Sequence, residues 1–182
     1  MNFAENRKIL NDLNRFKSAI PEAVAQMSSI SKNHFDKSFA NQGFTNETFE
    51  QWKPRKKEDR KRPKRAILIN TGDLRRSIRV VKFGSMAVRI TSDLPYAKIH
   101  NEGGEINKAE RNAKLYFKLN KSGDYFGGNA RFRKKKHSNF EMDVTIGAHT
   151  IKMPKRQFVG YSGVMSRKIE TKINQIFQKA LR

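Results

Sequence analysis

The chain of 182 residues has the length of one domain, and its 39 Lys and Arg against 17 Asp and Glu give a net charge of +22 that attracts polyanions or acidic proteins. It contains no cysteine, which excludes disulfides, thiolate catalysis and cysteine-based zinc sites and fits assembly in a reducing cytoplasm. No run of residues has the ~20 apolar residues of a membrane span or the apolar core of a signal peptide, so neither a membrane partner nor export is expected.

Residues 3 to about 39 are predicted to be helical. Ile9, Leu13 and Phe16 recur at steps of four and three residues, which places them on one face of a helix. Pro21 is expected to interrupt this helix or to start a second one, because proline lacks the N–H that a residue inside a helix donates. An apolar stripe of this length indicates a core or a subunit interface.

Residues 53–65 are predicted to form a basic arm or linker outside the core. Proline is the only apolar residue type in this run, so burial cannot offset the entropy lost on ordering. Glu58 and Asp59 are interpreted as moderating its charge. The candidates for docking or polyanion contact are Lys53, Arg55, Lys56, Lys57, Arg60, Lys61, Arg62, Lys64 and Arg65.

Residues 66–104 are expected to belong to the core. A short strand at 66–69 should precede a brief helix capped by Thr71 or Asp73, which would direct Leu74 and Ile78 inward.

A hairpin is predicted from 79–83 and 86–91, with a two-residue turn at Gly84-Ser85. Pro95 suits the first turn of a short helix, and Gly103-Gly104 should end that helix because glycine enters left-handed conformations without strain.

Residues 105–139 are interpreted as a basic insertion, whose docking candidates are Arg131, Arg133, Lys134, Lys135 and Lys136. Residues 140–182 return to the core, first as strands over 140–153 and then as a helix capped by Ser162. The expected fold is one α+β domain over 1–182. Its mainly antiparallel sheet, from 67–69, 79–91 and 140–153, should pack with the N- and C-terminal helices.

No catalytic or metal-binding group is evident in the sequence. The four histidines are scattered, and His100 has only Glu102 nearby, so a histidine that fixes a turn by hydrogen bonding is favoured over a general base. Gly72 and Gly103 lack the layout of a phosphate-binding loop and are interpreted as turn glycines. No cofactor and no enzymatic activity are expected.

Four groups of residues follow one another along the chain. The first is Phe39, Gly43, Phe44 and Trp52. The second is Leu68, Thr71, Gly72, Leu74, Ser77 and Ile78. The third is Tyr96, Ala97, Ile99, His100, Gly103 and Gly104. The fourth is Met153, Pro154, Arg156, Phe158 and Gly160. Their order resembles the phage virion morphogenesis (tail completion) family, the Mu-like neck proteins that help to join tails to filled heads.

The resemblance implies an α+β subunit of a ring, six or twelve copies by analogy, in the virion neck after assembly in the host cytoplasm. Its partners would be other neck, connector, tail terminator or tube proteins, with packaged DNA as a further candidate contact. Its role would be joining, without catalysis. The basic stretches 53–65 and 105–139 depart from a minimal member and would serve particular partners.

Charge leaves a different interpretation open, a DNA- or RNA-binding accessory protein acting through its basic segments. No helix-turn-helix, zinc-finger or RNA-recognition signature accompanies those segments, and aromatic residues that could stack on bases are sparse. An enzyme such as a small nuclease is a third and weaker alternative.

Overall fold

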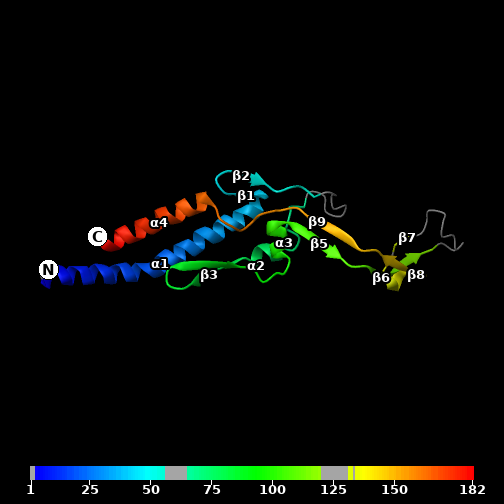
Figure 1. The fold of residues 1–182 in the computed structure, drawn as a ribbon, viewed down its shortest axis with the longest axis horizontal. Coiled ribbons are helices and arrows are strands. Elements are labelled where there is room, and N and C mark those ends of the chain that lie inside the picture. The colour runs from blue at the N-terminus through cyan, green and yellow to red at the C-terminus, as the bar shows by residue number, and fades with distance from the viewer. Residues whose placement is uncertain (1–2, 56–64, 120–130, 133) are drawn as a thin grey trace. The chain divides into compact units, whose positions relative to one another are not determined.

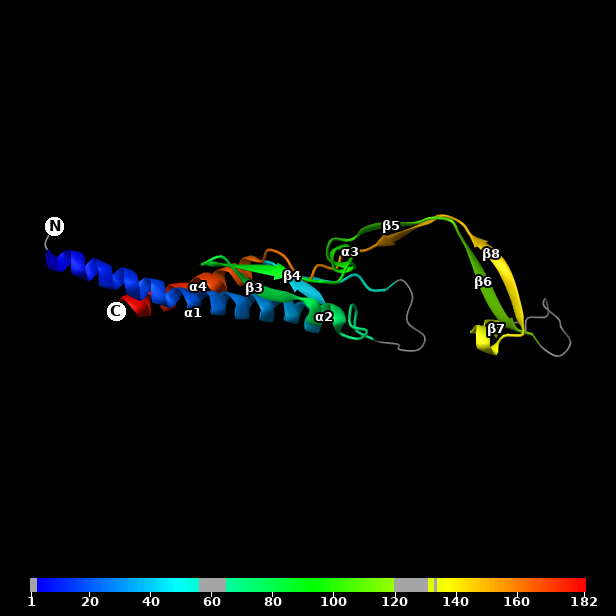
Figure 2. The same ribbon diagram turned by 90° about the horizontal axis from the view of Figure 1, so that it is seen from below.

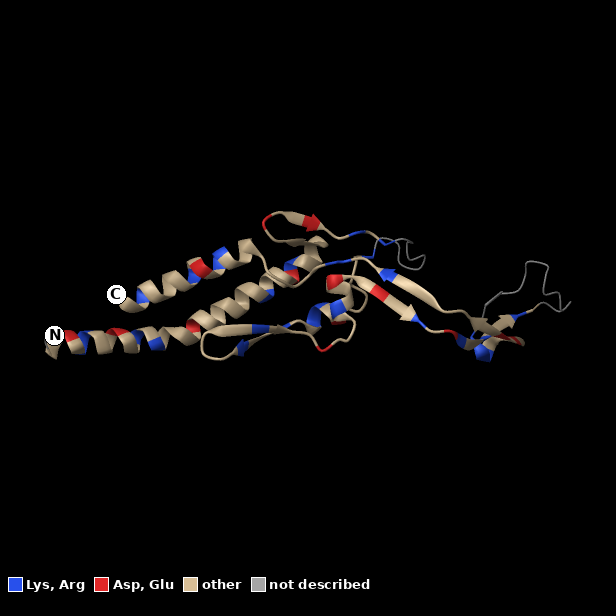
Figure 3. Ribbon diagram, in the orientation of Figure 1, with Lys and Arg blue, Asp and Glu red and all other residues tan. Residues whose placement is uncertain are grey.

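The computed structural model describes residues 3–55, 65–119, 131–132 and 134–182. The chain forms two compact units, one of Met1–Gly104 with Pro154–Arg182 and the other of Glu105–Met153. Helices and small antiparallel sheets are both present, which confirms the predicted α+β class (Figure 1). Lys and Arg lie on helices and strands of both units, so the positive charge is not confined to one element (Figure 3).

The first unit begins with helix α1 (Phe3–Asn41) and ends with helix α4 (Gly163–Leu181), which run side by side in opposite directions (Figures 1 and 2). Phe16 of α1 stacks on Phe177 of α4 with ring centroids 4.3 Å apart. Ser162 caps α4 as predicted, because its side chain accepts a hydrogen bond of 3.2 Å from the backbone N–H of Met165.

The predicted interruption of α1 at Pro21 is wrong, because the helix continues through this residue. Pro21 lies on the exposed side, where water can solvate the carbonyl that its missing N–H leaves free. On the opposite side Ala19 and Ala23 are buried against Ile176 of α4, and this packing stabilises the helix on both sides of the proline.

A larger core cluster lies around the C-terminal half of α1, β1 (Gly43–Thr45) and the loops that follow β2 (Phe49–Gln51). The expected burial of Leu74 and Phe158 is confirmed, since they are 4% and 1% exposed. The buried members are Phe35, Phe39, Phe44, Trp52, Leu74, Ile78, Ala97, Phe158 and Met165.

Hairpin β3 (Arg79–Phe83) and β4 (Ala87–Thr91) is antiparallel as predicted and lies along α1 (Figures 1 and 2). The predicted two-residue turn is wrong. Phe83 pairs with Ala87, so three residues form the turn, and Gly84 begins it with a left-handed φ of 67°.

Residues 66–69 form a turn rather than the expected strand. Gln42 replaces a neighbouring strand as their partner: its Nε2 donates to the carbonyl of Ile67 at 3.3 Å, and its Oε1 accepts from the N–H of the same residue. The turn places Leu68 at φ 58°, a left-handed conformation that is unusual for a bulky residue.

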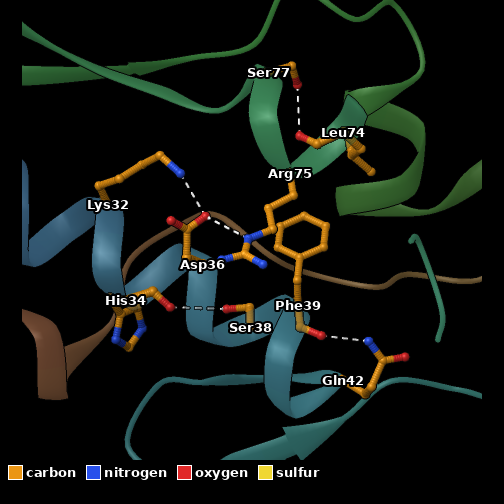
Figure 4. A network of polar contacts seen from close by, with 9 residues as sticks. All are labelled: Lys32, His34, Asp36, Ser38, Phe39, Gln42, Leu74, Arg75 and Ser77. Atoms are coloured by element: carbon orange, nitrogen blue, oxygen red, sulfur yellow. Dashed lines mark hydrogen bonds and ion pairs between the residues drawn. The ribbon is translucent and has the colours of Figure 1, made fainter. Parts of the chain in front are cut away.

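Helix α2 (Asp73–Ser77) has no side-chain cap, so the predicted capping by Thr71 or Asp73 is wrong. The Thr71 hydroxyl donates to the Asp73 carboxylate instead, and Gly72 precedes the helix with φ 82°. Asp36 of α1 ties the two helices together, because it accepts from Lys32 at 2.6 Å and from Nε of Arg75 at 3.4 Å (Figure 4).

Helix α3 (Ala97–Glu102) ends at Gly103, whose φ is 77°, as the glycine pair predicts.

The second unit pairs strands that the sequence analysis assigns to different parts of the fold. β8 (Phe140–Ile146) pairs antiparallel with β6 (Arg111–Lys118), which also pairs with β7 (Arg131–Phe132). β9 (His149–Met153) pairs with β5 (Gly104–Lys108).

The single sheet expected from 67–69, 79–91 and 140–153 is therefore wrong. The strands of the described residues form four separate small sheets, and 140–153 pairs with 104–118. The apolar alternation of β8 is matched by β6, where Phe117 is buried and its ring lies 6.4 Å from that of Phe140. The interpretation of 1–182 as one domain stays a prediction.

None of the helices in the described part of the chain combines the length and the apolar character needed to cross a bilayer.

Candidate functional site

The C-terminal motif Pro154–Gly160 is held by residues from distant parts of the first unit. Trp52 donates from its indole Nε1 to the carbonyl of Gln157 at 2.7 Å. The ring of Phe39 lies between those of Trp52 and Phe158, at centroid distances of 5.5 and 5.2 Å. These contacts join the end of α1, the residue that follows β2 and the segment before α4 into one core.

The last turn of α3 holds the same motif through its backbone. The side-chain oxygen of Asn101 accepts from the N–H groups of Phe158 and Val159, at 2.9 and 3.1 Å. The carbonyl of His100 accepts from the N–H of Arg156 at 3.0 Å. Three backbone donors of an extended segment are thus satisfied by a single helix end.

His100 and Arg156 also line an open cavity of about 410 Å³, here called the motif cavity. Residues from three of the four sequence motifs line it together, although they are up to 88 positions apart in the chain. The motif residues in its lining are Leu68, Thr71, Gly72, Leu74, Tyr96, His100 and Arg156.

Arg156 is the most deeply buried charged residue of the cavity, with 7% of its surface exposed. Its Nε donates to the carbonyl of Lys53 at 2.9 Å and its Nη2 to that of Pro54 at 3.2 Å. Burial, followed by the positive charge of Arg55, lowers the pKa of Arg156. The side chain therefore anchors the beginning of the basic stretch while it remains in an unfavourable electrostatic environment.

Two further arginines, which the sequence assigns to the docking arm, also line the cavity. Arg55 donates to the carbonyls of Arg65 and Ala66, at 2.6 and 2.7 Å. Arg65 donates from Nη1 to Oδ1 of Asn70 at 2.5 Å. The two ends of the 53–65 stretch are therefore tied to each other beside the motif residues.

The expectation that the imidazole of His100 fixes a turn by hydrogen bonding is wrong. The main chain of His100 makes the contacts, and within the described residues the buried Nδ1 has no hydrogen-bond partner. Burial, followed by the charge of Arg156, lowers the pKa of His100 and so favours the neutral ring. The Tyr96 ring meets it edge-on at a centroid distance of 6.0 Å.

The remaining motif residues stabilise turns and packing. Ser77 donates to the carbonyl of Leu74 at 2.8 Å, and its hydroxyl lies 2.8 Å from that of Ser92. Ile78 is 1% exposed and belongs to the core. Gly104 and Gly160 have φ of 131° and 149°, backbone conformations that side chains disfavour. Pro154 begins the segment that leads from β9 to α4 and is partly buried.

The basic candidates are only partly within the described residues. Lys53 is exposed, and Lys134, Lys135 and Lys136 are exposed around the short helix η1 (Lys135–His137). Arg131 lies on β7, and its side chain falls outside the described part. Lys56, Lys57, Arg60, Lys61, Arg62, Lys64 and Arg133 lie outside the described residues.

Three residues that the sequence analysis did not select hold the unit together. Asn101 lies inside the Tyr96–Gly104 motif, and Gln42 lies in the loop after α1 with φ 57°. Asn46 accepts from the N–H of Gly163 through Oδ1 at 3.0 Å, beside the start of α4. Each is an amide side chain in or next to a turn, and this position is the signal that could have identified them.

The described residues include no cluster of three or more His, Asp or Glu side chains placed to hold a metal ion.

The model for the phage virion morphogenesis family matches residues 5–178, nearly the whole chain. The chain belongs to this family. Neither a curated protein nor a solved structure matches it. Membership of the phage virion morphogenesis family indicates a structural or assembly role in the virion.

Proposed function

We propose that this protein joins heads to tails as a structural neck ring subunit, without a catalytic role. The observation that carries the proposal is the family match over residues 5–178. The motif residues support it, because they connect α1, α3 and the segment before α4 by packing and backbone hydrogen bonds. A rigid connecting subunit needs such contacts, whereas a catalytic site needs convergent acid, base or nucleophile groups.

Ring formation is supported by an apolar face at the beginning of α1. Phe3, Ile9, Leu10 and Leu13 are 82%, 44%, 60% and 50% exposed, although the same helix is buried further along. Exposed apolar residues grouped on one element are typical of an interaction surface. We propose that this face contacts adjacent subunits in a closed ring of six or twelve copies.

The isolated protein is expected to remain monomeric. Each copy carries a net charge of +22, and the repulsion between copies opposes association until other virion proteins supply a template. The partners that we propose are connector, neck and tail terminator or tube proteins.

The basic segments favour docking on acidic protein surfaces over binding of DNA. Ten ion pairs with phosphates would change the affinity for DNA by ~10³–10⁵ over a modest range of salt. Such binding along a channel would retard the genome that has to pass through it. A DNA- or RNA-binding accessory role is the alternative that the charge leaves open.

Purified virions provide the test. Mass spectrometry should detect the protein at six or twelve copies per particle, and immunogold labelling of an epitope-tagged protein should place it at the head–tail junction. Cross-linking in intact particles should yield dimers and higher multimers of this chain. Absence from purified virions would contradict the proposal, and a single copy per particle would contradict the ring.

A further inference from the structure

The motif cavity contains the positive charges of Arg55 and Arg156, which form no ion pair with any described carboxylate. Arg156 is 7% exposed, yet the ion pairs of the described residues include neither Arg156 nor Arg55. A buried charge is costly unless an opposite charge or several hydrogen bonds compensate it. Asp73 is the carboxylate in the lining, and it is already engaged by Arg76 at 2.5 Å and by the Thr71 hydroxyl.

Hydrogen-bonding capacity also remains unused at the same place. Main-chain carbonyls accept from Nε and Nη2 of Arg156, whereas Nη1 makes no hydrogen bond to any described residue. The buried Nδ1 of His100 is also unpartnered within the described part of the chain. Buried polar atoms are nearly always paired, so the orphaned Nδ1 of His100, in the same lining as an unused guanidinium nitrogen, indicates that a polar group is missing from the cavity.

We propose that the motif cavity binds a glutamate or aspartate side chain on a segment of a neighbouring virion protein. A carboxylate accepts hydrogen bonds and donates none. It also carries the negative charge that no described residue supplies to Arg55 and Arg156. The neutral imidazole of His100 can donate from Nδ1 to the same group. Ile67, Leu68 and Leu74 supply an aliphatic wall of the cavity for the methylene groups beside the carboxylate.

The geometry and the charge of the chain argue against two other occupants. Phosphates of duplex DNA lie on a convex surface and are met by exposed lysine and arginine side chains, whereas Arg156 is buried in a concave site. A second copy of this chain has the same excess of positive charge, which disfavours it as the source of the carboxylate, and the ring contact proposed above uses the beginning of α1 instead. A different, acidic protein satisfies both conditions.

The first test compares two synthetic peptides on the unaltered protein. One is acetyl-Gly-Leu-Glu-Leu-Gly-amide, and the other carries glutamine in place of glutamate. NMR titration should show that the glutamate peptide shifts the side-chain N–H signals of Arg156 and the imidazole ¹⁵N signals of His100. The glutamine peptide should bind at least ~10-fold more weakly, because it lacks the charge.

Equal binding of the two peptides, or peptide binding that leaves these signals unchanged, would overturn the proposal. Inorganic phosphate and a short DNA duplex serve as further probes. If either one moves the Arg156 signals while the glutamate peptide does not, the cavity is a phosphate site instead.

Arg156→Gln and Lys155→Gln form a matched pair of variants. Each removes one positive charge, and the two residues are adjacent, but Lys155 is exposed. Arg156→Gln should weaken the glutamate peptide by about 30-fold or more, and Lys155→Gln by less than about 2-fold. Equal losses of affinity in the two variants would show that the peptide responds to the net positive charge of the protein and not to the motif cavity. If Arg156→Gln does not fold, the comparison of the two peptides on the unaltered protein still decides the question.

The proposal does not depend on where the protein lies in the virion. Peptide binding is measured on the purified chain, whereas the neck position is measured on particles. Failure of one can therefore be distinguished from failure of the other.

Discussion

Replacing Phe158 by alanine is expected to lower the free energy of unfolding by about 3–5 kcal/mol. The residue is 1% exposed, so almost the entire side chain loses its contacts and leaves a cavity. About 0.5–1.5 kcal/mol of this loss should come from the aromatic contact with Phe39, whose ring centroid is 5.2 Å away. Loss of this side chain should loosen the junction that all four sequence motifs help to build.

Urea denaturation followed by the fluorescence of Trp52 measures the effect, because this is the only tryptophan and it belongs to the same cluster. In thermal denaturation, the melting temperature should fall by about 6–20 °C, because each kcal/mol lowers it by about 2–4 °C in a chain of this size. Tyr161→Ala is the control, since this aromatic side chain three positions further on is 73% exposed and should change stability by less than ~0.5 kcal/mol. A loss below about 1 kcal/mol for Phe158→Ala, or equal losses in both variants, would refute the assignment of this core.

Three further predictions concern the helix end, the histidines and the basic segments. Asn101→Leu should cost about 2–4 kcal/mol in urea denaturation, because two backbone N–H donors lose their acceptor, and an unchanged midpoint would contradict this. Burial lowers the pKa of both His34 and His100, so the unfolded chain binds more protons and stability should fall as the pH drops through about 6.5. In a variant with glutamine at both positions, stability should depend less steeply on pH. An identical pH profile would show that these histidines do not cause the dependence. Reversing three charges within 53–65 or within 131–136 should impair tail attachment while the DNA ejection rate of assembled particles stays nearly unchanged. Normal attachment with altered ejection would place these segments in the channel.

Local patterns predicted the elements well where each residue's neighbours are close in sequence. The helix over 3–39, the cap at Ser162 and the glycine after α3 follow from periodicity and turn chemistry within a few residues. Three local predictions were wrong. Packing of α1 against α4 stabilises the helix through Pro21, which disfavours it locally. Helix α2 has no side-chain cap, and three residues rather than two form the turn after Phe83.

Strand pairing was predicted less well, since alternation identifies a strand but not its partner. The pattern of 140–146 fits any half-buried sheet, and only the paired register with 111–117 assigns it to the second unit. The turn at 66–69 was missed for a similar reason, because its hydrogen bonds come from Gln42, which lies 25 positions earlier.

The candidate site was predicted as a set of motifs but not as a cavity. Thr71, His100 and Arg156 were each selected as structural residues, and nothing in their spacing indicates that they share one lining. The inward position of Arg55 could not be predicted either, since a run of basic residues is normally a solvated surface. Its two hydrogen bonds to Arg65 and Ala66 are made across the arm itself.

Deletion of the gene from the phage, followed by electron microscopy of the lysate, tests the head–tail joining role most directly. If the protein joins heads to tails, DNA-filled heads and complete tails should accumulate separately, and infectious particles should form when the purified protein is added to the mixture. Normal tailed particles from the deletion, or heads that fail to fill with DNA, would contradict this role.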